Sequence, residues 1–156
     1  MKRTIRYQGA IIRNDQILLI RHQEHAKGRS YWVIPGGGRE SNETEGACVQ
    51  REMREETNLD VVVERLLLDD VGVPMGVYKR LKTYLCKVVN GDAQPGYEPE
   101  IEAANQYAIA EVRWFDLRNP TELERLARND PFTFPLVQRI RAVLGYAVES
   151  STGGEE

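Results

Sequence analysis

The chain has 156 residues, of which 41% are hydrophobic and 29% charged, and its formal net charge is −3. This length fits one domain, and the composition is typical of a soluble globular protein with a core rather than a disordered or fibrous chain. The lack of a basic excess argues against general binding to nucleic acid or to an anionic membrane, although a local pocket could still bind a small phosphorylated ligand.

The N-terminal part predicts a β-hairpin. Residues 5–12 are rich in β-branched side chains and predict a strand. Asn14 and Asp15 both tolerate left-handed backbone angles and can form a tight turn. Residues 16–21 then predict the return strand of the hairpin.

The next segment predicts a loop, a short strand and a helix. Residues 22–30 are polar and loop-like, and residues 31–34 form a short apolar run that ends at Pro35 and three glycines. A helix is expected over residues 43–57, with Ser41 and Asn42 as the cap. Asn58 follows, and asparagine is the second choice after glycine for a left-handed helix stop.

The remaining elements complete one domain, expected over residues 1–149 and followed by a flexible tail at 150–156. Strands before and after helices predict a mixed sheet covered by helices. Residues 90–103 contain glycines and prolines and predict a loop. The other predicted strands are residues 59–68, 81–89 and 111–116, and the other predicted helices are 120–128 and 135–148.

The location expected from the sequence is the cytoplasm. No apolar run approaches the roughly 18 residues of a membrane span. The basic N-terminus lacks the long apolar segment of a signal peptide. Cys48 and Cys86 do not form a CxxC pair, so we expect two reduced thiols rather than a disulfide or zinc site.

Three carboxylates gather at the end of the predicted helix. Glu55 and Glu56 are three and four residues after Glu52, which places all three within an arc of about 100° on one helix face. Each like-charge pair costs roughly 0.2–0.5 kcal/mol. The helix dipole disfavours each anion in the last turn by about 0.3–1 kcal/mol. A bound dication would reverse both effects, and Mg²⁺ prefers such oxygen ligands.

A solvated charged face is the alternative for this turn, since Arg51 and Arg54 could partly neutralise it. The glycine run before the helix favours a ligand, because glycine lets the backbone approach closely and a helix N-terminus offers free N–H groups. An ordinary strand–turn–helix link would use such glycines equally well.

The region resembles the Nudix box, G-x5-E-x7-R-E-U-x-E-E-x-G-U, in which U is apolar. Here it reads Gly37, five residues, Glu43, seven residues, and then REMREETNL over residues 51–59, with Asn58 in place of the second glycine. The preceding WVIPGG and the later VRWF, at residues 32–37 and 112–115, also look like parts of that family. Because asparagine can adopt the same left-handed conformation, we expect the turn to be retained.

The resemblance implies an α/β protein with the Nudix fold, an α/β/α sandwich with a mixed β-sheet. It also implies hydrolysis of a nucleoside diphosphate linked to another group, with Mg²⁺ or Mn²⁺. The family uses ADP-ribose, nucleotide sugars, dinucleoside polyphosphates, nucleoside triphosphates and capped RNA ends, and many members are homodimers. A small-molecule nucleotide is therefore the expected substrate, and the sequence does not distinguish among these.

Site residues are carried over by position. The metal ligands implied are Glu52, Glu55, Glu56 and the Gly36 carbonyl. Arg51 and Glu43 would pair and hold the helix against the glycine loop, where Gly37 lies. The general base varies in the family, and is either a box glutamate such as Glu52 or an acidic residue on a later loop. A generic surface ion pair is the alternative for Arg51.

Several residues outside the box are weaker candidates, each of which could equally be a solvated or packing side chain. The candidates for a further acidic ligand are Glu98, Glu100, Glu102 and Glu111. The candidates for phosphate or base contacts are Arg21, Lys27, Arg29, Lys79, Arg80, Tyr31, Tyr78 and Tyr97. His22 and His25 lack nearby soft ligands, which argues against zinc.

A non-catalytic module that senses a nucleotide is the alternative function, and three like charges on one turn argue against it. An isomerase of the same fold would need further catalytic residues that the sequence does not identify.

Overall fold

The computed structural model describes residues 4–26, 28–96, 107–128 and 130–146. Its strands form one mixed sheet in the order β3-β2-β1-β6-β5, with β4 paired to β1 and β7 paired to β2. The β1–β6 pairing is parallel, and the other pairings that the structure describes are antiparallel. The strands are β1 (Ile5–Arg13), β2 (Gln16–Glu24), β3 (Ser30–Val33), β4 (Gly36–Gly38), β5 (Asp60–Met75), β6 (Tyr78–Asn90) and β7 (Tyr107–Asp116).

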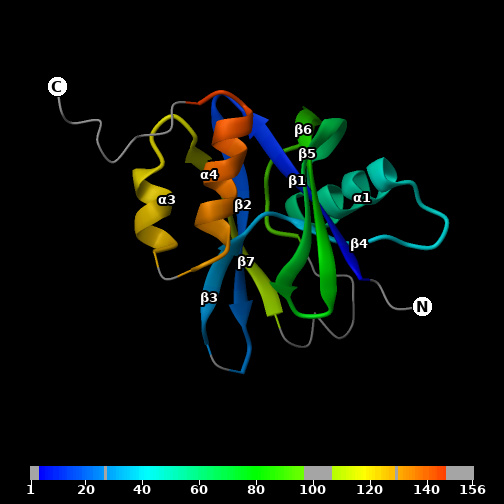
Figure 1. Ribbon diagram of the computed structural model, residues 1–156, viewed down its shortest axis with the longest axis horizontal. Helices are drawn as coiled ribbons and strands as arrows, with labels where there is room; N and C mark the ends of the chain where they lie inside the picture. Colours follow the sequence, from blue (N-terminus) through cyan, green and yellow to red (C-terminus); the bar gives the residue numbers. More distant parts are fainter. Residues whose placement is uncertain (1–3, 27, 97–106, 129, 147–156) are drawn as a thin grey trace.

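Helices lie on both sides of the strands (Figure 1). The helix α1 (Glu45–Thr57) lies on one side, and α3 (Thr121–Leu126) and α4 (Thr133–Val143) lie on the other. This arrangement confirms the predicted α/β/α sandwich with a mixed sheet. Within the described residues, the structure has no helix that is both long and apolar enough to span a membrane.

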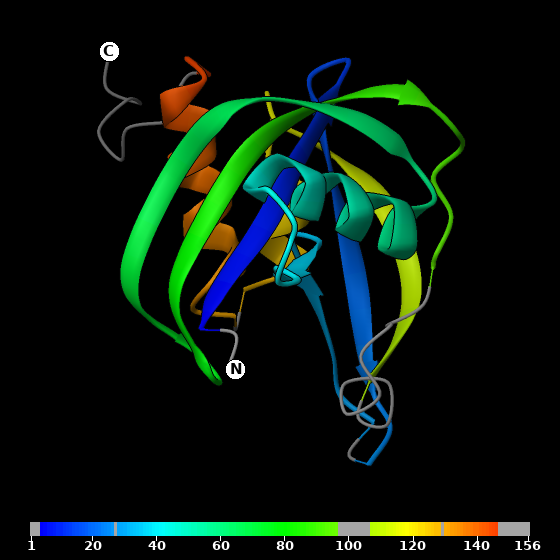
Figure 2. The ribbon, with the colours of Figure 1, turned by 90° about the vertical axis from the view of Figure 1, so that its right-hand side faces the viewer.

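The apolar core is divided by the sheet. On the α3 and α4 side, buried helix side chains pack against Ala10, Leu19 and Phe115. On the other side, α1 packs against β1 through Met53, and a Cβ on Gly9 would lie only 2.7 Å from the Met53 sulfur. Only a residue without a side chain lets the helix approach β1 this closely, and α1 crosses the sheet directly over that strand (Figure 2).

The predicted hairpin is confirmed, with Asn14 at φ 53° and Asp15 at φ 61° joining β1 to β2. The strand β2 continues to Glu24, so residues 22–24 are not in the predicted loop. Two pairings explain the extension: β3 pairs with His22 and Gln23, and β7 runs alongside β2 as far as the Glu24–Tyr107 register. A polar sequence could not indicate the long-range pairing with β7.

The predicted cap of α1 was wrong by two residues. Thr44 caps the helix, and its hydroxyl oxygen accepts a hydrogen bond from the Ala47 N–H at 3.1 Å. Glu45 ties the first turn to β6, because its carboxylate accepts hydrogen bonds from Lys82 and Tyr84. The end of the helix is as expected, since Asn58 adopts φ 64° in the left-handed region.

Candidate active site

Two glutamates of α1 face the glycine strand β4. Gly36 N–H donates a hydrogen bond of 2.9 Å to Glu56 Oε1. A Cβ on Gly37 would lie 2.6 Å from the Glu52 carboxylate carbon, so the strand passes directly beside that side chain. Glu52 and Glu56 are each 1% exposed. Two consecutive glycines thus fix the side chains of two glutamates one helical turn apart.

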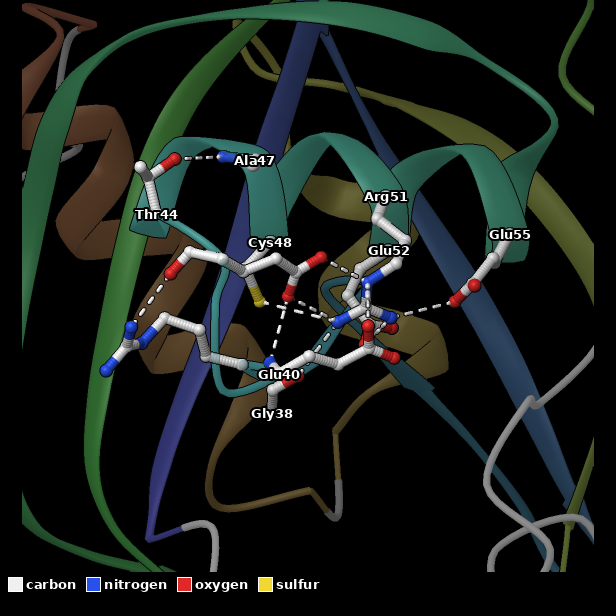
Figure 3. A network of polar contacts seen from close by, with 10 residues as sticks. Gly38, Glu40, Thr44, Ala47, Cys48, Arg51, Glu52 and Glu55 are labelled. Atoms are coloured by element: carbon white, nitrogen blue, oxygen red, sulfur yellow. Dashed lines mark hydrogen bonds and ion pairs between the residues drawn. The ribbon is translucent and has the colours of Figure 1, made fainter.

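Arg51 is the centre of the polar network beneath α1 (Figure 3). Its Nε donates to Glu43 Oε2 at 2.5 Å, and its Nη2 donates to Glu43 Oε1 and to the Gly38 carbonyl, both at 3.0 Å. Its Nη1 lies 3.1 Å from both Glu52 Oε2 and Glu55 Oε1. The structure therefore brings Glu43, Arg51, Glu52 and Glu55 together, and Arg51 joins α1 to the glycine strand.

The charges of this network are mutually stabilising. The hydrogen bonds to Glu43, and then the charges of Glu52 and Glu55, raise the pKa of Arg51 above its usual range despite its partial burial. One guanidinium nitrogen between two carboxylates also relieves part of the repulsion that the sequence predicts for this turn.

The donor set fits a hard divalent cation in its chemistry. Glu52 Oε2 and Glu55 Oε1 both contact the same positively charged atom, Arg51 Nη1. Carboxylate oxygens are the ligands that Mg²⁺ and Mn²⁺ prefer. Across the described ranges, however, three or more acidic, histidine or cysteine side chains are nowhere already arranged as a preformed metal site. A cation would have to compete with Arg51 for these oxygens.

The Gly36 carbonyl, a predicted ligand, lies at the same place on β4 but is already in a hydrogen bond. It accepts from Arg6 Nη1 at 3.1 Å, and Arg6 Nη2 donates to the Ile34 carbonyl at 2.7 Å. A carbonyl oxygen has two lone pairs, so this bond leaves one acceptor position. Sequence reasoning missed Arg6, although an arginine inside an apolar strand was an available signal.

The chain after β6 returns to the end of α1. The N–H groups of Gln94 and Gly96 donate to the carbonyls of Thr57 and Glu56, both at 2.9 Å, and Asn58 Nδ2 donates to the Asp92 carbonyl at 3.0 Å. These bonds satisfy carbonyls that the helix end leaves open. Asn58 therefore makes a bond that the glycine of the motif could not make.

The acidic candidates outside the box separate into two groups. Glu98, Glu100 and Glu102 lie outside the described residues. Glu111 is on β7, and its described partners are Arg21 and Arg113 rather than the α1 glutamates. Although burial opposes it, hydrogen bonds from these two arginines lower the pKa of Glu111. We therefore regard Glu111 as part of an ion-pair cluster on the sheet.

The basic candidates are not gathered at the acidic turn. Each of three arginines forms an ion pair elsewhere: Arg21 with Glu111, Arg29 with Glu24, and Arg80 with Asp69. Lys79 is exposed at the start of β6, next to Tyr78, while Lys27 and Tyr97 lie outside the described residues.

The two histidines do not share a site. His22 is buried on β2, where its ring meets the edge of the Tyr31 ring at 5.6 Å, whereas His25 is exposed. Burial, and then the charge of Arg6, lower the pKa of His22 to about 4. His22 is therefore neutral at physiological pH.

A family model for the NUDIX domain matches residues 4–138. The chain belongs to the Nudix hydrolase family. This confirms the resemblance drawn from the sequence. A search of curated protein sequences gave no significant match.

Solved structures share the Nudix fold at low sequence identity. A UDP-X diphosphatase is 21% identical with a TM-score of 0.63, and the match covers 93% of this chain but only 64% of that one. An ADP-ribose pyrophosphatase from Streptococcus suis is 23% identical with a TM-score of 0.56, covering 76% and 77% of the two chains. A Nudix hydrolase from Nitrosomonas europaea is 18% identical with a TM-score of 0.70, covering 98% and 100%. These likenesses establish the fold alone.

Proposed function

We propose that the protein is a Mg²⁺-dependent hydrolase that cleaves the pyrophosphate linkage of a nucleoside diphosphate joined to another group. The observation that carries this proposal is the acidic turn of α1, where Glu52 and Glu56 are almost fully buried, Glu52 against the charged Arg51 and Glu56 against the Gly36 N–H. Burying carboxylates beside one another is costly for a structural helix. It is useful where a cation and a phosphate chain must bind.

Glu52, Glu55 and Glu56 would hold the divalent ion, with the Gly36 carbonyl as a further candidate ligand. Mg²⁺, or Mn²⁺ in its place, supplies charge neutralisation at the phosphates and lowers the pKa of a bound water. The described residues hold the carboxylates that would bind this ion. Arg51 and the Gly36 N–H fix the carboxylates from two sides before any ligand binds.

The proton of the attacking water would pass to a carboxylate. Glu52 is one candidate for this base, because it is a carboxylate of the acidic turn itself. An acidic residue of a later loop is the other candidate, and Glu98, Glu100 and Glu102 lie outside the described residues. No covalent nucleophile is required in this mechanism.

The family and the names of two structural relatives support an order for the substrate panel. Those relatives are named as a UDP-X diphosphatase and an ADP-ribose pyrophosphatase. We therefore place nucleotide sugars and ADP-ribose first in a substrate panel. Dinucleoside polyphosphates and nucleoside triphosphates complete it.

The test is hydrolysis of this panel with and without Mg²⁺, followed as release of phosphate, pyrophosphate or nucleoside monophosphate. We expect Glu52→Gln and Glu56→Gln to lower kcat by at least about 100-fold while folding is retained. Glu124→Gln, on the exposed face of α3, is the matched control and should keep the wild-type rate. Wild-type rates in both site variants would refute the assignment. Thermal stabilisation by a nucleotide without any product would instead support a sensing module.

A further inference from the structure

The Arg6 side chain lies buried beneath the turn between β3 and β4. It is 8% exposed, and its guanidinium binds the carbonyls on either side of Pro35, those of Ile34 at 2.7 Å and Gly36 at 3.1 Å. Its Nε donates to Gln8 Oε1 at 3.3 Å. Among the described residues its partners are two carbonyls and an amide oxygen, without a carboxylate.

A buried guanidinium that has no carboxylate partner in the described part of the chain is an expensive way to hold a turn. Its planar fork can nevertheless bind two separate carbonyl oxygens at a fixed spacing, which a lysine ammonium cannot reproduce. The Pro35 carbonyl between them accepts from the Gly9 N–H at 3.0 Å. Groups of β1 therefore bind three consecutive carbonyls of this turn.

The turn has little freedom to move away from β1. A Cβ on Gly36 would lie 2.6 Å from the Gln8 Cα, so the two backbones are in direct contact. Gln8 is held in turn by β6, since its Nε2 donates to the Thr83 hydroxyl at 2.9 Å. Gln8 is 1% exposed and Thr83 is 0% exposed, so bulk water does not compete for these bonds.

The backbone of Gly36 also holds a glutamate of the acidic turn. Its carbonyl accepts from Arg6, and its N–H, which belongs to the preceding peptide group, donates to Glu56 Oε1 at 2.9 Å. A continuous buried chain of hydrogen bonds thus runs from β6 through β1 and β4 to α1. Any shift of the Gly36 backbone that follows the loss of Arg6 would move the donor of Glu56.

We infer that Arg6 is a positioning residue of the proposed site, which fixes the backbone of Gly36 and through it the Glu56 carboxylate. This inference rests on the proposed function, since it assigns Arg6 to the same acidic turn. A direct contact between Arg6 and a substrate phosphate is the competing role. Three of the five guanidinium N–H groups are already used on described acceptors, which favours positioning.

The test compares Arg6→Lys with Arg141→Lys. Arg141 is a matched control, because it is also buried and donates to a backbone carbonyl, that of Leu117 at 2.6 Å, on the α4 side of the sheet. Mn²⁺ affinity of each protein is measured by electron paramagnetic resonance without substrate, and kcat and KM are measured separately. Residues that orient metal ligands typically change metal affinity or activity about 10- to 100-fold.

We expect Arg6→Lys to bind Mn²⁺ at least about 10-fold more weakly and to lose kcat by a similar factor, with KM nearly unchanged. Arg141→Lys should lower the melting temperature without changing Mn²⁺ affinity. Unchanged Mn²⁺ affinity and kcat in Arg6→Lys would overturn the inference. So would a higher KM alone, which indicates substrate contact, or an equal loss of Mn²⁺ affinity in Arg141→Lys, which indicates general destabilisation.

A milder variant covers the case in which Arg6→Lys does not fold. Gln8→Leu removes the acceptor of Arg6 Nε together with the donor to the Thr83 hydroxyl, and it should weaken Mn²⁺ binding several-fold. Wild-type binding in that variant would also overturn the inference. Failure of the proposed function can be distinguished from failure of the inference about Arg6. A wild-type protein that binds Mn²⁺ but hydrolyses nothing would refute the hydrolase proposal, while the Mn²⁺ affinities still decide the role of Arg6.

Discussion

Adding one methyl group at Gly37 should inactivate the protein while leaving it folded. A Cβ at this position would lie 2.6 Å from the Glu52 carboxylate carbon and 2.8 Å from Oε1, whereas an ordinary contact begins at 3.4 Å. Gly37 is outside the left-handed backbone region, so alanine would introduce this clash without backbone strain. The carboxylate is the flexible end of its side chain and would therefore move rather than the backbone.

The required movement of the Glu52 carboxylate is about 1 Å, and a displacement of that size at a reacting centre can cost about 100-fold in rate. We expect Gly37→Ala to lower kcat by about this factor. The movement also weakens the hydrogen bond between Arg51 and Glu52, which is 3.1 Å long. A bond to a charged group contributes about 1.5–3 kcal/mol, and its partial loss should reduce stability by roughly 1 kcal/mol.

The matched control is Gly46→Ala, the same addition in the first turn of α1. A Cβ there has no neighbour within 4 Å. Alanine in a helix is more stable than glycine by about 0.5–1 kcal/mol, so this variant should keep full activity and melt at a higher temperature. Activity is measured on whichever panel substrate the wild type cleaves, and stability by circular dichroism. Wild-type activity in Gly37→Ala would show that the position of Glu52 does not limit the reaction.

Two further predictions concern stability. Gly96→Ala should destabilise the protein by about 1–3 kcal/mol in urea unfolding, which is the usual cost of overpacking. The new Cβ would lie 2.7 Å from the Glu55 carbonyl carbon. An unchanged unfolding midpoint would show that residues 91–96 are not held against α1. Burial, and then Arg6, lower the pKa of His22 from 6.5 to about 4 in the folded protein. Below pH 6.5 the unfolded chain therefore binds a proton at His22 that the folded protein does not, and the free energy of unfolding falls as the pH decreases toward 4. Between pH 7.5 and 5.5 this loss should be roughly 1 kcal/mol. His22→Gln should remove this pH dependence, whereas the control His25→Gln should keep it. An equal dependence of the free energy of unfolding on pH in both variants would contradict the assignment.

Local features of the fold could be predicted from the sequence because each depends on neighbouring residues. The Asn14-Asp15 turn and the Asn58 helix stop require left-handed angles, and the side chains that tolerate them stand at those positions. The helical spacing of the glutamates also depends only on the chain itself. The start of α1 was less certain because Ser41, Asn42 and Thr44 are all competent caps, and only the packed structure selects one.

Long-range contacts explain what the sequence did not predict. The end of β2 at Glu24 pairs with β7, which lies more than eighty residues later in the chain. The role of Arg6 depends on a turn almost thirty residues away, and the cover over the end of α1 comes from residues 91–96. Spacing within a motif gives no information about such partners, so the hydrogen bonds that orient the acidic side chains were visible only in the fold.

The way in which the acidic turn is held has a consequence for its response to a cation. Three other parts of the chain hold this turn of α1, namely β4, β1 through the bond from Arg6 to Gly36, and residues 91–96, so its carboxylates are positioned only in the folded protein. Arg51 now contributes the positive charge between Glu52 and Glu55. A divalent ion with two charges at that point interacts more strongly with the same oxygens than a delocalised guanidinium does. Cation binding should therefore shift Arg51 toward Glu43 and Gly38, where its other nitrogens are already bonded, rather than disrupt the network.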